Sequence, residues 1–361
     1  MLVETGFIKE RVPFKALLKL KALTKNSDFI IVYLPPNFNP YAAYSILKKI
    51  SNNLPFLALY VPYVGINKIS SEFLGVAAFK FESPKTKITI KVSQDVFSLV
   101  EYLSRKNEDL ILLFLTQTSQ NFLENFSILE KNIRTSIKIL GMTTGVKPQN
   151  GQNPLITNHG LFFDNTIVSL HFYNFKVKHT TVFGFKSLGP YFKFTATNAI
   201  YMDTIENLPA TKFFKNILKK AQLPIEDETL TAFSLALGLK KKHIWHIRHP
   251  KRFVEDKIEF WGPLPKEGRF KFGVYTDVEN ELNDILNKDL EIWNSYEFTF
   301  IFNCVGKRYS IEPKYEFENF MKKVQIPINF LGSFGEIASD QDGILHYLNG
   351  SMNIVALKEK K

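Results

Sequence analysis

The sequence predicts an α/β protein of mixed α+β type, with two domains and with mixed β-sheets flanked by helices. Two observations predict this class. A plan of strand, helix, strand and strand (β-α-β-β) occurs three times, and 361 residues are enough for two ordinary domains. Hydrophobic residues make up 45% of the chain and charged residues 22%, which is near the globular average, so we expect the whole chain to fold.

The first unit opens with the apolar run DFIIVYL at 28–34, which is typical of a buried strand. A helix is predicted over NPYAAYSILKKIS, because Asn39 suits the N-cap and Pro40 the first helical position. The runs FLALYV and FLGVAAFKF supply a second and a third strand, with a turn near Gly65 between them.

The second unit opens with DLILLFL at 109–115 and continues with IKILGMTTG, a strand that runs into a turn between Gly141 and Gly145. The segment LFFDNTIVSLHFYNF follows, and its turn between Asp164 and Thr166 predicts a hairpin. A helix between the first two strands is predicted from four apolar residues on one face: Phe122, Phe126, Leu129 and Ile133.

The third unit opens with EFTFIFNC at 297–304, and Pro313 begins its helix. The apolar face of that helix is Phe317, Phe320, Met321 and Val324. The segment INFLGSFGEI then takes the place of LALYVPYVG and KILGMTTG in the first two units. Ligands of open α/β sheets bind beyond the carboxyl ends of strands, and glycines there allow close backbone approach, so these strand-end loops are candidate site elements.

A different region, 174–296, separates the second and third units. It contains strands or a hairpin in KFTATNAIYMDTI, a helix from Pro209, a short helix in DETLTAFSLALGL, strands in HIWHIRH and RFKFGVYT, and the helix DVENELNDILNKDLEIW. The polar stretch 203–208 predicts a boundary between domains 1–205 and 206–361.

The net charge of +11 raises the question of nucleic acid. Most of the excess is scattered over predicted helix faces, and the one dense cluster is KKKHIWHIRHPKR, from Lys240 to Arg252. Because no nucleic-acid-binding module accompanies it, nucleic acid is disfavoured as a partner. No apolar run approaches bilayer length and no signal peptide is recognisable, so we expect a cytoplasmic protein without membrane contact.

The sequence favours neither a metal nor a cofactor. His243, His246 and His249 are spaced by three, but strand alternation places His246 on the opposite face, and basic neighbours disfavour a cation. Surface solvation is favoured over an anion contact for Arg248. There is no phosphate-binding G-x-x-x-x-G-K, no G-x-G-x-x-G after a strand and no G-x-S-x-G.

Two residues in the third unit invite a chemical role. Cys304, the one cysteine of the chain, precedes Lys307 and Arg308, whose charges would lower a thiol pKa. The absence of a local histidine base favours a buried or ligand-lining cysteine over a nucleophile. Glu336 directly follows Gly335, and we weigh it as a ligand contact against a surface residue, with catalysis less supported.

The C-terminal motifs FIFNCVGKRYSIEP, INFLGSFGEI and LNGSMNIVAL resemble the closing motifs of FIST domains, which are sensory domains of signal-transduction proteins. Gly335, Glu336 and Ile337 match the second motif residue for residue, and Asn349 and Ser351 approximate the third. Upstream, ILGMTTG and GLFFDNTIVSL are similar to family segments, so the resemblance extends from about residue 25. The first loop, Tyr63 to Lys68, departs from the family's Thr-Thr-x-Gly-Glu type of turn.

The resemblance implies a FIST N-terminal-like domain (1–205), a FIST C-terminal-like domain (206–361) and a stand-alone sensor. The sensor would bind an amino acid or a similar small polar metabolite and pass its state to a partner protein. The predicted ligand-binding residues are Ser333, Gly335, Glu336, Thr143, Thr144, Cys304 and Arg308.

In this hypothesis Glu336 accepts hydrogen bonds or pairs with an ammonium group, the glycine-turn amides hold a carboxylate or carbonyl, and the threonines fix the orientation of the ligand. Two alternatives stay open. One is a metabolite enzyme that uses Cys304 or Glu336, and the other is a binder of nucleic acid or an acidic partner through Lys240 to Arg252.

Overall fold

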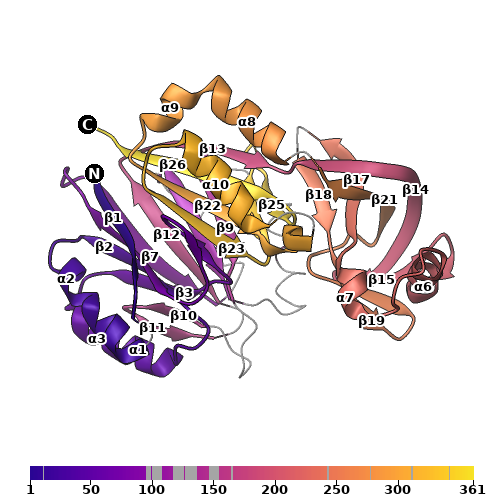
Figure 1. Cartoon of the computed structure of the whole chain (residues 1–361), viewed down its shortest axis with the longest axis horizontal. Coiled ribbons are helices and arrows are strands. Elements are labelled where there is room, and N and C mark those ends of the chain that lie inside the picture. The colour runs from indigo at the N-terminus through magenta and orange to yellow at the C-terminus, as the bar shows by residue number, and fades with distance from the viewer. Residues whose placement is uncertain are drawn as a thin grey trace.

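The computed structural model describes residues 1–10, 12–94, 99, 108–116, 126, 136–145, 154–163, 166–241, 244–276, 278–309, 312–340 and 342–361. Within these residues the strands form four sheets, three of six strands and one of eight, with helices on their outer faces (Figure 1). The predicted class, mixed sheets flanked by helices, is confirmed.

Three structural repeats build the six-stranded sheets. The first comprises β1 (Leu2–Ile8), α1 (Pro13–Lys19), α2 (Lys21–Thr24), β2 (Phe29–Leu34), α3 (Pro40–Ser51), β3 (Phe56–Tyr60), β4 (Val64–Gly65), β5 (Ile69–Ser70) and β6 (Leu74–Lys80). The second comprises β7 (Lys87–Ser93), β8 (Leu110–Leu115), β9 (Lys138–Thr143), β10 (Leu155–Thr157), β11 (Gly160–Phe162) and β12 (Ile167–Tyr173).

The third repeat is interrupted by an inserted sheet. It comprises β13 (Phe175–Val182), then α8 (Val278–Lys288), α9 (Leu290–Asn294), β22 (Phe298–Cys304), the 3-10 helix η1 (Val305–Tyr309), α10 (Pro313–Lys323), β23 (Ile328–Ser333), β24 (Glu336–Ser339), β25 (Leu345–Leu348) and β26 (Met352–Glu359).

The same pairing scheme recurs in each repeat. In each repeat, the strand before and the strand after the central helix position in the sequence pair in parallel. These pairs are β2 with β3, β8 with β9 and β22 with β23. The last strand of the repeat lies antiparallel to the first of these two, as β6, β12 and β26 do. The predicted threefold β-α-β-β plan is therefore confirmed for the strands. Asn39 caps α3 as predicted, since its side chain accepts a hydrogen bond from the Ala42 N–H at 3.0 Å.

Each repeat sends its hairpin into the sheet of another repeat. The hairpin β4–β5 of the first repeat pairs with β23 of the third, and β24–β25 of the third pairs with β9 of the second. The hairpin β10–β11 of the second repeat pairs with β3 of the first, which closes the cycle. The three sheets are thus interlocked by exchange of hairpins.

One sequence prediction of strand pairing is wrong, and one predicted short helix is present but shorter than its segment. A hairpin was expected around the turn from Asp164 to Thr166, but β11 belongs to the first sheet and β12 to the second. The short helix α7 (Asp227–Thr231) ends early, because Ser234 already begins a strand that pairs with β21. The predicted helix around Phe122, Leu129 and Ile133 lies outside the described residues.

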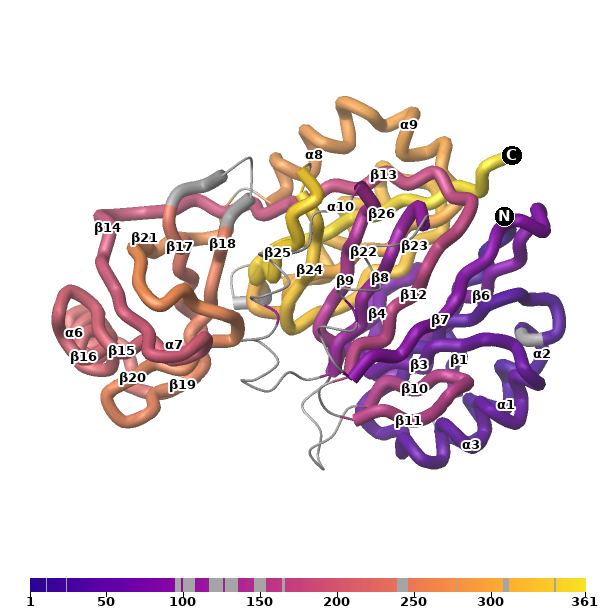
Figure 2. Tube along the Cα trace, turned by 180° about the vertical axis from the view of Figure 1, so that it is seen from behind, coloured from indigo at the N-terminus to yellow at the C-terminus, as the bar shows by residue number. Residues whose placement is uncertain are grey.

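The inserted sheet lies to one side of the repeats (Figures 1 and 2). Its elements are β14 (Phe185–Asn198), β15 (Tyr201–Ile205), β16 (Leu208–Pro209), α6 (Ala210–Lys220), α7, β17 (Ser234–Lys241), β18 (Ile244–Arg248), β19 (Pro250–Val254), β20 (Lys257–Phe260) and β21 (Glu267–Tyr275). The expected domain boundary at residue 205 falls between β15 and β16, which pair with each other, so this sheet does not divide there.

The three six-stranded sheets share one aromatic core. Phe79 from the first sheet contacts Phe298 from the third, with ring centroids 5.1 Å apart, and Phe114 from the second contacts Phe302 at 6.1 Å. All four side chains are buried, and such edge-to-face pairs are favourable ring geometries. In the described part of the chain, no helix is both long and apolar enough to cross a membrane.

Gly141 tests the packing of the second sheet. A Cβ at this position in β9 would lie 2.1 Å from the carbonyl oxygen of Leu113 in β8, so the two strands would have to move apart. We expect Gly141→Ala to lower the free energy of unfolding by about 1–3 kcal/mol in chemical denaturation. Gly6→Ala is the control, because a Cβ at Gly6 in β1 meets nothing within 4 Å. Equal stability of the two variants would contradict this packing.

Candidate functional site

The loops that follow the parallel strands of the three repeats meet at one place. The Gly332 N–H of the third repeat donates to the Tyr63 carbonyl of the first at 3.0 Å, and the Gly145 N–H of the second donates to the Tyr60 carbonyl at 2.9 Å. The second and third repeats are joined by the Thr143 N–H, which donates to the Gly335 carbonyl at 2.8 Å. These backbone bonds hold together the three strand ends that the sequence predicted as candidate site elements.

Glu336 lies at this junction as the first residue of β24 and is completely buried. Its carboxyl group accepts hydrogen bonds from the Ser333 hydroxyl at 2.7 Å, the Ser351 hydroxyl at 3.0 Å and the Ser351 N–H at 3.3 Å. The exchanged hairpins of the other two repeats begin with apolar residues at this position, Val64 and Leu155. The third repeat therefore places an ionisable group where the other two place an apolar side chain.

Burial raises the pKa of Glu336 to about 7, because the ionised carboxylate has lost its water. The hydrogen bonds from Ser333 and Ser351, and the positive charge of Lys307, oppose this rise without cancelling it. The group therefore changes its charge near neutral pH, and a cation bound beside it would favour the ionised form.

Cys304 ends β22 directly beside Ser333, its partner in the parallel pairing with β23. Burial raises the pKa of the Cys304 thiol, and the charge of Glu336 adds to the rise, whereas Lys307 lowers it only in part. Desolvation therefore outweighs the cation, which agrees with the preference for a buried cysteine over a reactive thiolate. Cys304 is a protonated thiol that lines the site.

A buried ion pair supports the site from the side of α10. Lys307 and Glu316 are joined at 2.6 Å, and the Asn303 side-chain N–H₂ donates to Glu316 at 2.7 Å and to the Tyr63 hydroxyl at 3.1 Å. Lys307 is thus already neutralised within the protein. Because Tyr63 belongs to the first repeat, this network also connects the first and third repeats.

The inserted sheet contributes aromatic and polar groups. The Tyr275 hydroxyl lies 3.0 Å from His249 Nε2, and its pKa is raised by burial and by the nearby Cys304 and Glu336. Burial lowers the pKa of His249 to about 4, so its ring is neutral at pH 7. The Trp261 ring lies 6.3 Å from that of Phe334 in the third strand-end loop. The site is therefore shared between the repeats and the inserted sheet.

The threonines and Gly335 lie at the junction but have structural partners. The Thr143 hydroxyl lies 3.2 Å from that of Tyr347, and the Thr144 hydroxyl donates to the Leu115 carbonyl at 2.9 Å. A Cβ at Gly335 would lie 2.1 Å from the Tyr347 hydroxyl oxygen, so glycine is needed for the close approach of that tyrosine. These contacts assign the three residues a positioning role.

The amides of the third glycine turn are already used within the protein. The Phe334 N–H donates to the Thr143 carbonyl at 3.2 Å, and the Gly335 N–H donates to the Ser333 hydroxyl at 3.2 Å. Each of these N–H groups is already committed to an acceptor, which disfavours the expected contact with a carboxylate or carbonyl of a ligand.

The site instead contains hydrogen-bond acceptors that have no donor among the described residues. The side-chain oxygens of Asn303 and Asn349 are buried and accept no hydrogen bond from any residue that the structure describes. The orientation of Asn303 is fixed, because its nitrogen must face the acidic oxygen of Glu316. A ligand or water that donates hydrogen bonds complements these oxygens, and a ligand that only accepts does not.

The structure thus brings together six of the seven predicted site residues: Ser333, Gly335, Glu336, Thr143, Thr144 and Cys304. The side chain of Arg308 lies outside the described part of the chain. Sequence reasoning missed Ser351 as a partner of Glu336, although it had singled out the motif LNGSMNIVAL. It also missed the roles of Tyr63, which lies in the first strand-end loop, and of His249, which was weighed only as a metal ligand. For Tyr275 the sequence carries no local signal.

The basic cluster from Lys240 to Arg252 offers less free charge than its sequence indicated. Arg248 was expected at the surface, but it is 2% exposed, and it donates to the Pro263 and Ile247 carbonyls at 2.7 and 2.8 Å. Lys251 and Arg252 both pair with Glu259, at 2.6 and 2.5 Å.

The histidines of this cluster do not converge. His246 lies against His346, with ring centroids 5.2 Å apart, whereas His249 lies against Tyr275. His243 is outside the described residues. Over the residues whose positions are described, no three histidine, cysteine, aspartate or glutamate side chains are arranged to hold a metal.

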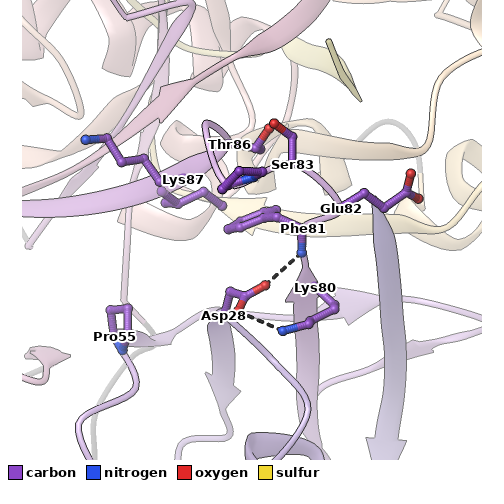
Figure 3. Close-up of a pocket in the computed structure, with 10 residues that line it drawn as sticks. Asp28, Pro55, Lys80, Phe81, Glu82, Ser83, Thr86 and Lys87 are labelled. Atoms are coloured by element: carbon purple, nitrogen blue, oxygen red, sulfur yellow. Dashed lines mark hydrogen bonds and ion pairs between the residues drawn. The ribbon is translucent and has the colours of Figure 1, made fainter. Parts of the chain in front are cut away.

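A surface pocket of about 500 Å³ lies elsewhere, between the end of β6 and the start of β7 (Figure 3). Asp28 lies in it, but this carboxylate already pairs with Lys80 at 3.0 Å and accepts the Phe81 N–H at 2.8 Å. The predicted site residues do not line this pocket. The junction around Glu336 is the stronger candidate, because its groups come from all three repeats and from the inserted sheet.

Comparison with known proteins gives no family assignment. No protein-family model matches this chain, and no curated protein is found with a similar sequence. The resemblance to FIST domains therefore rests on the motifs of the sequence alone.

The pH dependence of stability tests the burial of Glu336. Its pKa in the folded protein, about 7, exceeds the ordinary value of 4.5, so folding takes up a proton between these values. The stability due to this proton is complete below pH 4.5 and is lost as the pH rises to about 7, by an amount on the order of 3 kcal/mol. We expect Glu336→Gln to remove this loss in denaturation measured at pH 5 and pH 8.

Ser333→Ala provides the comparison for this experiment. It deletes a hydrogen bond that favours the ionised carboxylate, so the pKa of Glu336 should rise further and the loss of stability should extend to higher pH. The same pH dependence in Glu336→Gln as in the unaltered protein would show that another group causes it.

The reactivity of the thiol tests the environment of Cys304. Because its pKa is raised by burial, we expect negligible alkylation by iodoacetamide in the folded protein at pH 8 and rapid alkylation in denaturant. The signal is unambiguous, since the chain has one cysteine. Reaction of the folded protein with an apparent pKa at or below about 8.5, the value of a free cysteine, would contradict the assignment.

Proposed function

We propose that this chain is a cytoplasmic sensory protein that binds a small polar metabolite carrying an ammonium group, such as an amino acid, at Glu336. One observation carries the proposal. Glu336 is a completely buried carboxyl group at a position where the other two repeats have Val64 and Leu155. An apolar residue would fill such a position without the cost of desolvation, which favours a functional reason for the acid.

The hydrogen-bond balance of the site supports a donor ligand. The Glu336 carboxylate and the side-chain oxygens of Asn303 and Asn349 are acceptors, whereas the turn amides are committed within the protein. An ammonium group carries three donors and a positive charge, and it would favour the ionised form of Glu336. Binding is therefore expected to be coupled to loss of a proton near neutral pH.

The sensory part of the proposal rests on the resemblance to FIST domains and on the position of the site. Tyr275, His249 and Trp261 belong to the inserted sheet, so a ligand at Glu336 would contact groups from two parts of the chain. A change in their packing is a route by which a bound state would be passed to a partner protein. Catalysis is the weaker alternative, because the Cys304 thiol is protonated.

A thermal-shift screen against amines, amino acids and their N-acetylated counterparts tests this function. A ligand that binds the folded state raises the melting temperature by mass action. We expect stabilisation by compounds with a free ammonium group, and loss of that stabilisation when the group is acetylated or when Glu336 is changed to Gln. The expected loss of affinity is at least about tenfold, since hydrogen bonds to charged groups contribute about 1.5–3 kcal/mol.

Glu108→Gln is the matched control. Glu108 is also buried and accepts a hydrogen bond from the Tyr173 hydroxyl at 2.9 Å, but it precedes β8 and so lies at the opposite end of that strand from Thr143 and Glu336. A ligand that stabilises Glu336→Gln as strongly as the unaltered protein would exclude Glu336 as its receptor.

A further inference from the structure

The helix α1 is apolar on two faces. Ala16, Leu17 and Leu20 are buried and pack in the core of the first repeat. On the other side Phe14 is 57% exposed and Leu18 is 43% exposed. The two side chains are neighbours on the helix surface because they are four residues apart. A surface helix ordinarily presents polar groups outward, so we expect the exposed stripe of Phe14 and Leu18 to contact another molecule.

The stripe is extended by its surroundings. Val12, directly before α1, is 46% exposed, and Tyr41 at the start of α3 is 65% exposed. Tyr41 also contacts Phe163, with ring centroids 5.9 Å apart, so the stripe proper consists of Val12, Phe14 and Leu18. Exposed apolar side chains that lie close together are typical of interaction surfaces. The helices α1, α2 and α3 form one layer on the outer side of the first sheet, at the end of the molecule away from the inserted sheet (Figures 1 and 2).

The same layer is strongly basic. Its exposed cations are Lys15, Lys21, Lys25, Lys48 and Lys49, together with Lys19, which pairs with Glu10 at 3.3 Å. The helices α1, α2 and α3 contain no aspartate or glutamate. Asp28, the one acid between residues 13 and 51, pairs with Lys80 of β6. The outer face thus combines exposed apolar side chains with an excess of positive charge.

The helix α6 shows that positive charge occurs in this protein without exposed apolar side chains. It carries Lys212, Lys215, Lys219 and Lys220, all exposed. Its large apolar side chains are buried or half-buried, as Phe214 and Phe213 are. α6 is therefore an ordinary solvated basic helix, and it provides a control for charge alone.

We propose that the outer face of α1–α3 docks onto an anionic membrane surface. Phe14 and Leu18 would enter the boundary between headgroups and acyl chains, and the surrounding lysines would meet lipid phosphates. A nucleic acid would match the charge but would leave the aliphatic side chains of Val12 and Leu18 without apolar contact. This departs from the expectation of no membrane contact, which rested on the absence of a long apolar run.

Vesicle co-sedimentation tests the docking, with phosphatidylcholine vesicles and with vesicles that also contain phosphatidylglycerol. We expect binding to the anionic vesicles alone, and weaker binding as salt is added. Phe14→Gln with Leu18→Gln should weaken binding at least tenfold without a large loss of stability, because both side chains are exposed. Lys15→Gln with Lys25→Gln should weaken it roughly 25-fold, since each charge contributes roughly fivefold.

The control pair is Lys215→Gln with Lys219→Gln on α6, which should bind vesicles as the unaltered protein does. Failure to bind anionic vesicles would overturn the proposal, and so would equal weakening by the α6 pair, which would indicate general charge attraction. Self-association in solution that is abolished by Phe14→Gln with Leu18→Gln, without vesicle binding, would identify a second copy of the chain as the occupant and would also overturn it.

Discussion

The exchange of hairpins between the three repeats is the constraint on which the rest of the structure depends. In each repeat the second parallel strand would be a sheet edge, with unpaired N–H and C=O groups along its length. A hairpin from another repeat covers that edge, as β24 covers β9 and β4 covers β23. Because the exchange runs in a closed cycle, each of the three sheets needs a segment from another repeat, and the repeats fold as one unit.

The candidate site follows from this exchange. The hairpins β4–β5 and β24–β25 begin close after the ends of β3 and β23, and backbone bonds join those strand ends to the end of β9. The N–H groups of Gly332, Gly145 and Thr143 donate these bonds. Glu336 begins one exchanged strand and is sealed by its pairing opposite Met142. The burial that raises its pKa is thus a consequence of the topology.

The protein has two surfaces of different character on this framework. The site around Glu336 is internal, and groups from the inserted sheet close it through Tyr275 and Trp261. The basic and apolar face of α1–α3 is external and lies at the far end of the first sheet. In the functions proposed, the first would receive a small ligand and the second would place the protein at a membrane surface.

The sequence by itself determined the local elements. Continuous apolar runs such as 28–34 and 109–115 form the buried strands, and the capping pattern at Asn39 and Pro40 begins a helix where it predicts one. The threefold plan and the strand-end position of Glu336 were also visible, because both depend on the order of residues along the chain. Helix propensity alone did not predict the structure from Ser234 onward. There β17 pairs with β21, and this pairing ends the short helix.

Only the tertiary structure decided which segments pair across long distances. The placement of β11 and β12 in different sheets, and the approach of Ser351, Tyr63 and Tyr275 to the site, depend on contacts between residues far apart in sequence. It likewise decided the chemical state of Cys304 and Glu336. Sequence neighbours such as Lys307 suggest a lowered thiol pKa, but desolvation by the surrounding sheets is the larger effect, and it arises only when the three repeats close around the site.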